Sequence, residues 1–246
     1  MSQTIGAPAP HDRMFTMSEA VQDALAAEAV SMVQPGMIVG IGSGTTAARA
    51  LRFLADRVKH ESLDISVIAA SDATEAVCNA SGLKALDFAT VEELDLLIDG
   101  ADEVDHAMRM MKGSGGAMTR ERMLAWASDT RVFLVREHKI SDRLGTRTTL
   151  AVAIMAFGLA STRAALRRMG LNGVLRRSIA GELFITDNGN LLLDVVLPEH
   201  SDVEDIARSL HAIPGVVDHG LFSDEADIIF VERGDGTVDR MERAED

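Results

Sequence analysis

The sequence has little of what a secreted, membrane-spanning or nucleic-acid-binding protein needs. Cys78 is the single cysteine in 246 residues, so no intrachain disulfide can form and we expect a cytoplasmic setting. No apolar run approaches the roughly 20 residues that a membrane-spanning helix requires, and the N-terminus lacks a secretion signal. Basic residues are few, 24 against 38 acidic ones, and the net charge of -14 argues against a nucleic-acid partner. We therefore expect neither a membrane nor a nucleic acid among its partners.

The composition that remains is that of an ordinary globular protein, with 47% hydrophobic and 25% charged residues. Residues 1–17 show no periodicity, and we expect them to form a flexible leader. After Ser18, segments with helical and strand-like patterns alternate, which is typical of a mostly parallel sheet in an α/β fold. Helices are expected at 18–33, 48–58, 73–80 and from Ala117, and strands at 37–42, 65–71, 83–88, 95–100 and 131–137.

The pattern changes beyond about Thr148. A helix is followed by a hairpin that turns at Asn188-Gly189, then by a second helix, which together suggest a small α+β lobe. A last segment with a Gly-Asp-Gly turn returns the chain to the main sheet. The expected organisation is a leader at 1–17, an α/β catalytic domain at 18–147 and 224–246, and an α+β lobe at 148–223.

The first motif that can bind a ligand is IVGIGSGTTAARAL, a strand that ends in glycines and hydroxyls where a helix begins. Because ligands of such sheets bind beyond the carboxyl ends of the strands, this loop is expected to cradle an anion. Its donors would come from Ser43, Gly44, Thr45 and Thr46. A tight turn without a ligand is the alternative. A dinucleotide motif fails at Thr45, no P-loop lysine follows, and a methyltransferase motif lacks its acidic residue at Ile38.

The second motif is LLIDGADEVD, which places four acidic residues at the end of another strand: Asp99, Asp102, Glu103 and Asp105. Crowded carboxylates repel one another and shift their pKa values, which suits general acid or base chemistry on sugar hydroxyls. A divalent metal site or helix capping is the alternative, although the order differs from that of a calcium-binding loop.

The third motif, MKGSGGAMTRERML, joins a lysine and a glycine turn to the first turn of a helix. Lys112 and the amides of residues 113–116 are suited to stabilise an oxyanion, and Glu121 to move a proton beside it. The alternative makes Glu121 a partner of the helix dipole and the glycines a linker. In a fourth stretch, VREHKISDRLG, Lys139 is either a phosphate ligand or a solvated lysine.

In this order, the four motifs resemble those of the A-type ribose-5-phosphate isomerases. The resemblance extends from about Met14 to near Glu242 and includes TDNGNLLLDV and AIPGVVDHGLF. It implies a doubly wound α/β fold with an inserted ferredoxin-like lobe. It also implies an aldose–ketose isomerase that interconverts D-ribose 5-phosphate and D-ribulose 5-phosphate in the non-oxidative branch of the pentose phosphate pathway, with no metal and no cofactor.

The resemblance assigns roles to individual residues. The family's proton-transferring glutamate falls on Glu121, the aspartates of its DGAD motif on Asp99 and Asp102, and its turn lysine on Lys112. The implied substrate-binding residues are Ser43, Gly44, Thr45, Thr46, Asp99, Gly100, Ala101, Asp102, Lys112, Gly113, Ser114, Gly115 and Lys139. In the implied mechanism, Asp99 helps to open the cyclic sugar, and Glu121 carries the C2 proton to C1 through a cis-enediolate. Family members form dimers and tetramers, so a homodimer or homotetramer is expected.

The chain departs from the family pattern in three places. GSGTT replaces the usual GTGST, KGSGG replaces KGGGG and places a side chain at Ser114, and AVAI replaces Pro-Val-Glu-Val near the lobe. A non-catalytic sugar-phosphate sensor is the second hypothesis, but the leader is too short and too poor in basic residues for the DNA-binding motif of such regulators. Outside the motifs, Trp126 and Cys78 fall in helical patterns and are expected in the core.

Overall fold

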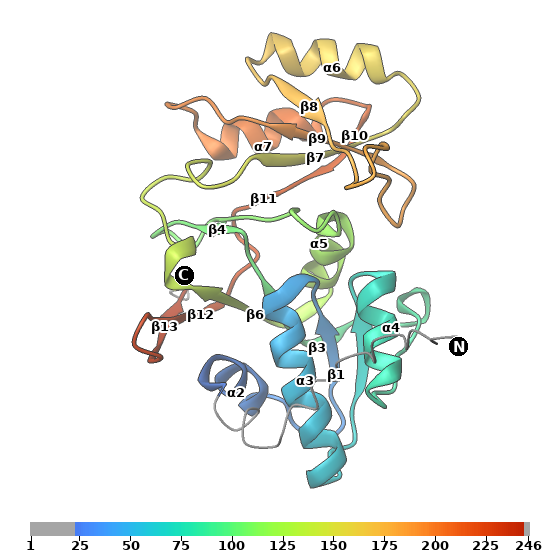
Figure 1. Cartoon of the computed structure of the whole chain (residues 1–246), viewed down its shortest axis with the longest axis vertical. Helices are drawn as coiled ribbons and strands as arrows, with labels where there is room; N and C mark the ends of the chain where they lie inside the picture. The colour runs from blue at the N-terminus through green and yellow to red at the C-terminus, as the bar shows by residue number, and fades with distance from the viewer. Residues whose placement is uncertain (1–22, 244–246) are drawn as a thin grey trace, which may run out of the picture.

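The computed structural model describes residues 23–243, and a six-stranded sheet forms the centre of the larger part of the molecule (Figure 1). Its strand order is β13-β12-β6-β3-β1-β2, and all neighbours run parallel except the antiparallel edge strand β13. The strands are β1 (Ile38–Ile41), β2 (Ser66–Ala69), β3 (Leu94–Gly100), β6 (Ser128–Arg136), β12 (Ile228–Glu232) and β13 (Val238–Glu242). The segment after the lobe therefore returns to the main sheet, as the sequence predicts.

Helices cover both faces of this sheet, which confirms the doubly wound α/β fold. They are α2 (Ala24–Ser31), α3 (Gly44–Glu61), α4 (Asp72–Ala80) and α5 (Met118–Trp126), with short 3-10 turns η1 (Phe88–Thr90) and η2 (Glu137–Lys139). On one face, α2 and α3 bury residues such as Leu25 and Leu54 against the sheet. On the other face, α5 packs Leu124 into a second apolar cluster that also contains Phe133 and Phe222. No helix within residues 23–243 is both long enough and apolar enough to cross a membrane.

The smaller part of the molecule, here called the small lobe, has a ferredoxin-like βαββαβ order. Its four-stranded antiparallel sheet has the order β10-β7-β9-β8. The elements are β7 (Leu150–Ile154), α6 (Leu159–Arg168), β8 (Gly173–Leu175), β9 (Leu191–Val195), α7 (Val203–His211) and β10 (Val216–His219). A three-stranded sheet of β4 (Glu103–Val104), β5 (Met110–Met111) and β11 (Leu221–Phe222) lies between the small lobe and the main sheet (Figure 1).

Several expected elements differ locally. The expected leader and the first five residues of the helix expected from Ser18 lie outside the described residues. Within the described residues, α2 begins at Ala24, after the capping residue Asp23. The expected strand at 83–88 makes a single bridge, Val67 to Ala85, because Asp87 caps the following 3-10 turn instead. The hairpin does turn at Gly189, which has a φ of +78°, but its first arm pairs only through isolated bridges.

The two residues that the sequence assigns to the core have different fates. Cys78 is fully buried, as expected. Trp126 is 91% exposed, so the prediction of a core position is wrong. Trp126 is the last residue of α5 and lies on its exposed side, whereas its neighbours Leu124 and Ala125 are buried.

Candidate active site

The predicted motifs meet at the carboxyl ends of β1 and β3, beside the turn between β5 and α5. A cavity of about 250 Å³ lies there. The residues that line it are Ser43, Gly44, Thr45, Thr46, Gly100, Ala101, Asp102, Lys112, Gly113, Ser114, Gly115, Glu121 and Lys139. Asp99 is the one predicted site residue outside this lining, and it lies fully buried beneath Lys112. The fold therefore brings together residues that are up to 96 positions apart in the chain.

The floor of this cavity is a buried lysine between two buried carboxylates. Lys112 Nζ lies 2.8 Å from Asp99 Oδ2 and 3.2 Å from Glu121 Oε2, and it also donates to the Gly100 carbonyl. The rings of Phe133 and Phe222 lie 5.5 and 5.7 Å from the same ammonium group. Since apolar rings and few water-accessible atoms surround these charges, their mutual interactions are poorly screened.

The protonation of these groups depends on the balance between burial and neighbouring charge. Burial raises the pKa of Asp99, and the nearby Glu121 carboxylate raises it further, while Lys112 opposes both effects. Burial alone would lower the pKa of Lys112, but the carboxylates of Asp99 and Glu121 raise it above its ordinary value. Lys112 is therefore a fixed positive charge, and Asp99 is a carboxylate that holds a proton more readily than usual.

The N-terminus of α3 forms another wall of the cavity and adjoins this floor. Ser43 caps the helix without a side-chain capping bond, because its hydroxyl donates instead to Glu121 Oε1 at 2.6 Å. Gly44, Thr45 and Thr46 of the first turn of α3 line the cavity, and the free amides of a helix N-terminus together with threonine hydroxyls can bind an anion. Gly42 is required at the end of β1, because a Cβ there would lie 1.8 Å from Asp99 Oδ1.

The rim of the cavity is held by hydrogen bonds to the backbone. Asp102 Oδ2 accepts a bond from the Ser114 amide at 2.9 Å, which ties the acidic motif to the glycine turn. Lys139, in η2, donates to the Ala101 carbonyl. Burial lowers the pKa of Lys139, so this amine loses its proton more readily than a solvated lysine.

The remaining acidic residues of the second motif point away from the cavity. Glu103 is buried against the loop before β7, where it accepts bonds from Thr146 Oγ1 and from the backbone amides of residues 145–148. Asp105 pairs with Arg109 at 2.7 Å and accepts from two nearby amides. Only Asp99 and Asp102 of the four acidic residues are therefore part of the site. The alternative of a shared metal site does not match this arrangement.

The part of the chain that the structure describes contains one group of three potential metal ligands, away from this cavity: His211, Asp218 and His219. Asp218 already pairs with Arg122 Nε at 2.9 Å, and His219 Nδ1 accepts the Leu221 amide at 3.2 Å. Burial lowers the pKa of His219 to about 3, so its ring is neutral. The Nδ1 bond leaves the ring proton on Nε2, the atom that would have to bind the metal.

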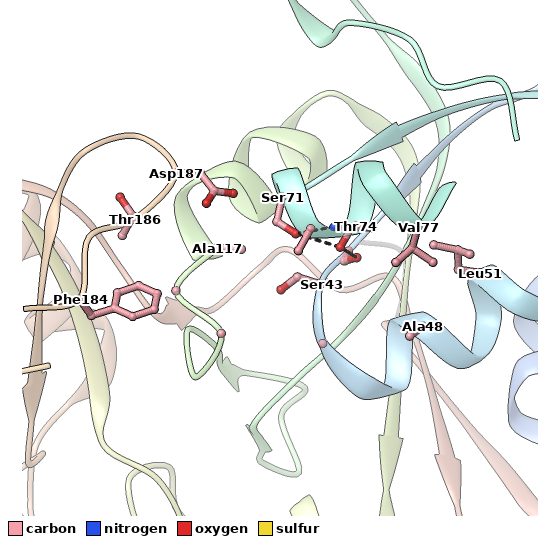
Figure 2. A pocket seen from close by; sticks show the side chains of 15 residues that line it. Ser43, Ala48, Leu51, Ser71, Thr74, Val77, Ala117, Phe184, Thr186 and Asp187 are labelled. Carbon is pink, nitrogen blue, oxygen red and sulfur yellow. Dashed lines mark hydrogen bonds between the residues drawn. The ribbon is translucent and has the colours of Figure 1, made fainter. Parts of the chain in front are cut away.

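Two further parts of the site lie mostly outside the four motifs. A second cavity of about 320 Å³ adjoins the first through Ser43, Gly44 and Gly115. Figure 2 shows Ser71, which caps α4, and Thr74 of α4 on one side of it, and Phe184, Thr186 and Asp187 of the small lobe on the other. In addition, Arg176 of the small lobe binds the carbonyl groups of the glycine turn. Neither residue spacing nor composition marks these contacts, because they join segments that are distant in the sequence.

The fold and the site together define an α/β protein with a ferredoxin-like lobe and a buried lysine–carboxylate centre next to an anion-binding helix end. The family model of ribose 5-phosphate isomerase A (phosphoriboisomerase A) matches residues 66–236. The chain is 40% identical over 225 residues to ribose-5-phosphate isomerase A of Chlamydia trachomatis serovar A, covering 91% of this chain and 92% of that protein.

The comparison with solved structures also finds ribose 5-phosphate isomerases. The ribose 5-phosphate isomerase A of Methanocaldococcus jannaschii superimposes with a TM-score of 0.85 at 29% identity, over 92% of this chain and 100% of that one. A D-ribose-5-phosphate isomerase in complex with phospho-erythronic acid gives a TM-score of 0.86 at 28% identity, over 93% and 100%. The chain belongs to the ribose 5-phosphate isomerase A family of aldose–ketose isomerases.

Proposed function

We propose that this protein interconverts D-ribose 5-phosphate and D-ribulose 5-phosphate. The observation that carries the proposal is Glu121: a buried carboxylate held by Lys112 and Ser43, in a cavity that is also lined by a helix N-terminus with two threonine hydroxyls. A sugar phosphate satisfies both ends of this cavity, because its phosphate suits the helix end and its C1–C2 unit then reaches the carboxylate. Family membership supports the same reaction.

In this proposal the phosphate is held by the first turn of α3 and by Lys139. Gly44, Thr45, Thr46 and Lys139 line the cavity, so that backbone amides, two threonine hydroxyls and one amine are available as donors to the phosphate. Binding energy from the phosphate then fixes the position of the reacting carbons, which lie several bonds away. This binding is local, which suits a chain whose net charge is -14.

Ring opening requires a proton to move from the C1 hydroxyl to the ring oxygen. Asp102 lines the cavity and is placed to contact the sugar, whereas Asp99 is covered by Lys112. We therefore assign the direct contact with the sugar to Asp102. Asp99 acts through Lys112, because it fixes the position and the charge of the Lys112 ammonium group. Both aspartates remain in the catalytic set with Lys112 and Glu121.

The isomerisation itself moves one proton between two carbons. The Glu121 carboxylate takes the proton from C2 of the open aldose, and the electron pair of the C–H bond forms the enediolate while charge develops on O1. Lys112 stabilises this charge. Glu121 then returns the proton to C1, the O2 proton moves to O1, and the ketose is formed. The sequence of steps requires no external oxidant or base.

The test is conversion of ribose 5-phosphate by the purified protein in EDTA, with Glu121→Gln beside it. Glu75→Gln is a matched control, because Glu75 is an exposed glutamate on α4 that undergoes the same chemical change. We expect turnover in EDTA and a loss of about 10³-fold in kcat for Glu121→Gln alone. Near-normal turnover of Glu121→Gln would exclude the proton transfer proposed for it, and turnover abolished by EDTA would show that a metal takes part.

We also propose a cytoplasmic homodimer or homotetramer, with the domain division at residues 148 and 224. Exposed apolar side chains of the small lobe support self-association: Phe157 is 89% exposed, and Val174 and Ile179 are exposed as well. Light scattering coupled to size-exclusion chromatography would measure the mass. A monomer at all concentrations would contradict the oligomer.

A further inference from the structure

Arg176 joins the small lobe to the glycine turn of the candidate active site. It follows β8 directly, and its Nη1 donates to the Gly113 carbonyl at 2.7 Å and to the Ser114 carbonyl at 3.0 Å. The turn therefore receives two hydrogen bonds from one guanidinium group that is 63 residues away in the chain. Arg176 itself lies outside the four sequence motifs.

The Arg176 side chain is itself held in place. Asp194 on β9 accepts from both Nε, at 3.0 Å, and Nη2, and the exposed fractions of the two side chains are 15% and 20%. The Phe184 ring lies 5.8 Å from the guanidinium carbon and also covers Gly116, where a Cβ would lie 2.6 Å from the ring. Two-point pairing with a carboxylate orients an arginine in a way that a lysine cannot reproduce.

The orientation of these carbonyl groups fixes the orientation of the following amides. All peptide bonds of the described chain are trans, so each N–H points roughly opposite to the carbonyl of the same peptide unit. The Gly113 carbonyl points to Arg176, and the Ser114 amide accordingly points the other way, to Asp102 Oδ2. By the same rule, the Gly115 amide points away from Arg176.

The direction of the Gly115 amide matters because of its surroundings. Gly115 lines the cavity, and a Cβ on it would lie 3.4 Å from Ser43 Oγ, the hydroxyl that donates to Glu121. Within residues 23–243, the Gly115 amide makes no hydrogen bond. An N–H group of a cavity residue that adjoins the Ser43–Glu121 pair is placed to bind an oxygen of the enediolate.

We propose that Arg176 is a positioning residue that aims the Gly115 amide at the developing oxyanion. This inference rests on the proposed isomerase activity and deepens it, because it makes the oxyanion site depend on the small lobe. Arg176 does not contact the substrate. Its two bonds keep the peptide units on either side of Ser114 from rotating, which a turn with a Gly113 φ of +112° would otherwise permit.

The experiment compares Arg176→Met with Arg176→Lys and with the control Arg177→Gln. Arg177 is the adjacent residue, is exposed, and donates only to the Gly181 carbonyl at 2.7 Å. Since loss of one oxyanion donor costs about 10²–10³-fold in kcat, a misdirected donor should cost about 10–100-fold in Arg176→Met. We expect KM for ribose 5-phosphate to change by less than about 3-fold, Arg176→Lys to recover little, and Arg177→Gln to match the wild type.

A purely structural role is tested by two ligands. Phospho-erythronic acid carries a carboxylate where the substrate would carry the enediolate oxygens, whereas inorganic phosphate reports only on the α3 end of the cavity. In Arg176→Met we expect Kd for phospho-erythronic acid to weaken by the same factor as kcat/KM, and Kd for phosphate to stay unchanged. Asp194→Asn is the second variant if Arg176→Met does not fold, and it should show a smaller loss of the same kind.

Different outcomes would refute the role of Arg176 and the proposed isomerase activity. Unchanged kcat in Arg176→Met, or an equal loss of phosphate and phospho-erythronic acid binding, would overturn the role of Arg176 while the isomerase activity stands. A wild-type protein that converts no ribose 5-phosphate would refute the proposed function. In that case an unchanged affinity of Arg176→Met for phospho-erythronic acid would overturn the inference independently.

Discussion

Asp99 and Glu103 lie four positions apart, and both are fully buried, yet their surroundings differ in every other respect. Asp99 accepts one backbone bond, from the Gly100 amide, and faces the ammonium group of Lys112. Glu103 accepts bonds from one hydroxyl and from the amides of residues 145–148. Burial raises the pKa of Asp99, whereas the hydrogen bonds to Glu103 outweigh burial and lower its pKa.

The comparison shows that burial alone does not make a carboxylate reactive. Hydrogen-bond donors around a carboxylate stabilise its charged form, so that the group does not readily take up a proton. A charge with few donors remains sensitive to its neighbours, which is what acid–base chemistry requires. The motif LLIDGADEVD therefore supplies Asp99 and Asp102 to the site and Glu103 to the joint with the small lobe.

The largest effect is expected from Lys112→Met, which removes the cation that Asp99 and Glu121 share. We expect kcat to fall by at least about 10³-fold and the free energy of unfolding to fall by about 3–5 kcal/mol at pH 8, because two buried carboxylates lose their partner. The loss in the free energy of unfolding should become smaller toward pH 5, because the buried carboxylates of folded Lys112→Met then bind protons that the unfolded chain does not bind. Urea titration followed by circular dichroism measures this, with Lys59→Met, on an exposed residue, as the control. A deficit that is independent of pH would contradict the explanation.

The next largest effect is expected from Asp99→Asn. We expect kcat/KM to fall by about 10²-fold, because the charge that fixes the Lys112 ammonium group is lost. Because the pKa of Asp99 is raised in the folded protein, the folded form keeps a proton that the unfolded form has already lost, and ionising Asp99 lowers the free energy of unfolding. The wild type should therefore lose stability relative to Asp99→Asn as the pH rises through the folded pKa of Asp99. Unfolding at a series of pH values, together with the pH profile of kcat/KM, checks both statements. A constant difference in stability would show that the pKa of Asp99 is not raised.

Glu103→Gln should have the opposite dependence on pH. We expect a loss of about 1–3 kcal/mol in the free energy of unfolding at pH 7, since donors to a buried charge lose an acceptor. Because the folded pKa of Glu103 is lowered, its contribution is present above the unfolded pKa and is lost as the pH falls through the folded value. Urea titrations at neutral and at acidic pH measure this. Activity should stay within a few-fold of the wild type, and a loss comparable to that of Asp99→Asn would remove the distinction between the two carboxylates.

Thr146→Val should give the smallest effect. The Thr146 hydroxyl donates to Glu103 Oε1 at 2.7 Å, and its removal leaves the amide donors in place. We expect a loss of about 0.5–1.5 kcal/mol at pH 7, with unchanged kcat. Thermal unfolding of Thr146→Val alone and in combination with Glu103→Gln tests the pair: additive losses would show that the hydroxyl does not act through Glu103.

Much of the site was predictable because its parts are local in sequence. Each motif is a strand end or a turn of fewer than fifteen residues, and parallel strands bring their carboxyl ends to one edge. The order of the elements predicted the parallel sheet and a small α+β lobe, and the resemblance to the family predicted that this lobe is ferredoxin-like. The orientation of individual side chains was not predictable, as Glu103 and Asp105 show: within one motif, the acidic spacing cannot indicate which carboxylates face the ligand.

Contacts between distant segments were not predictable either. Arg176 and Phe184 reach the glycine turn from the small lobe, and no periodicity in the sequence relates these segments. The Trp126 error has a different cause. Helical periodicity assigns a face to each residue, but α5 ends at Trp126, where nothing in the described chain covers that face.

The exposure of Trp126 also determines what the intrinsic fluorescence of this protein can measure. It is the only tryptophan, and the chain has no tyrosine, so nearly all ultraviolet emission originates from one indole on the surface. Denaturant changes the environment of that indole little, and its emission maximum is therefore a poor gauge of unfolding. The same property makes it a good gauge of association: a second subunit that covers the end of α5 would shift the emission to shorter wavelength and shield it from iodide.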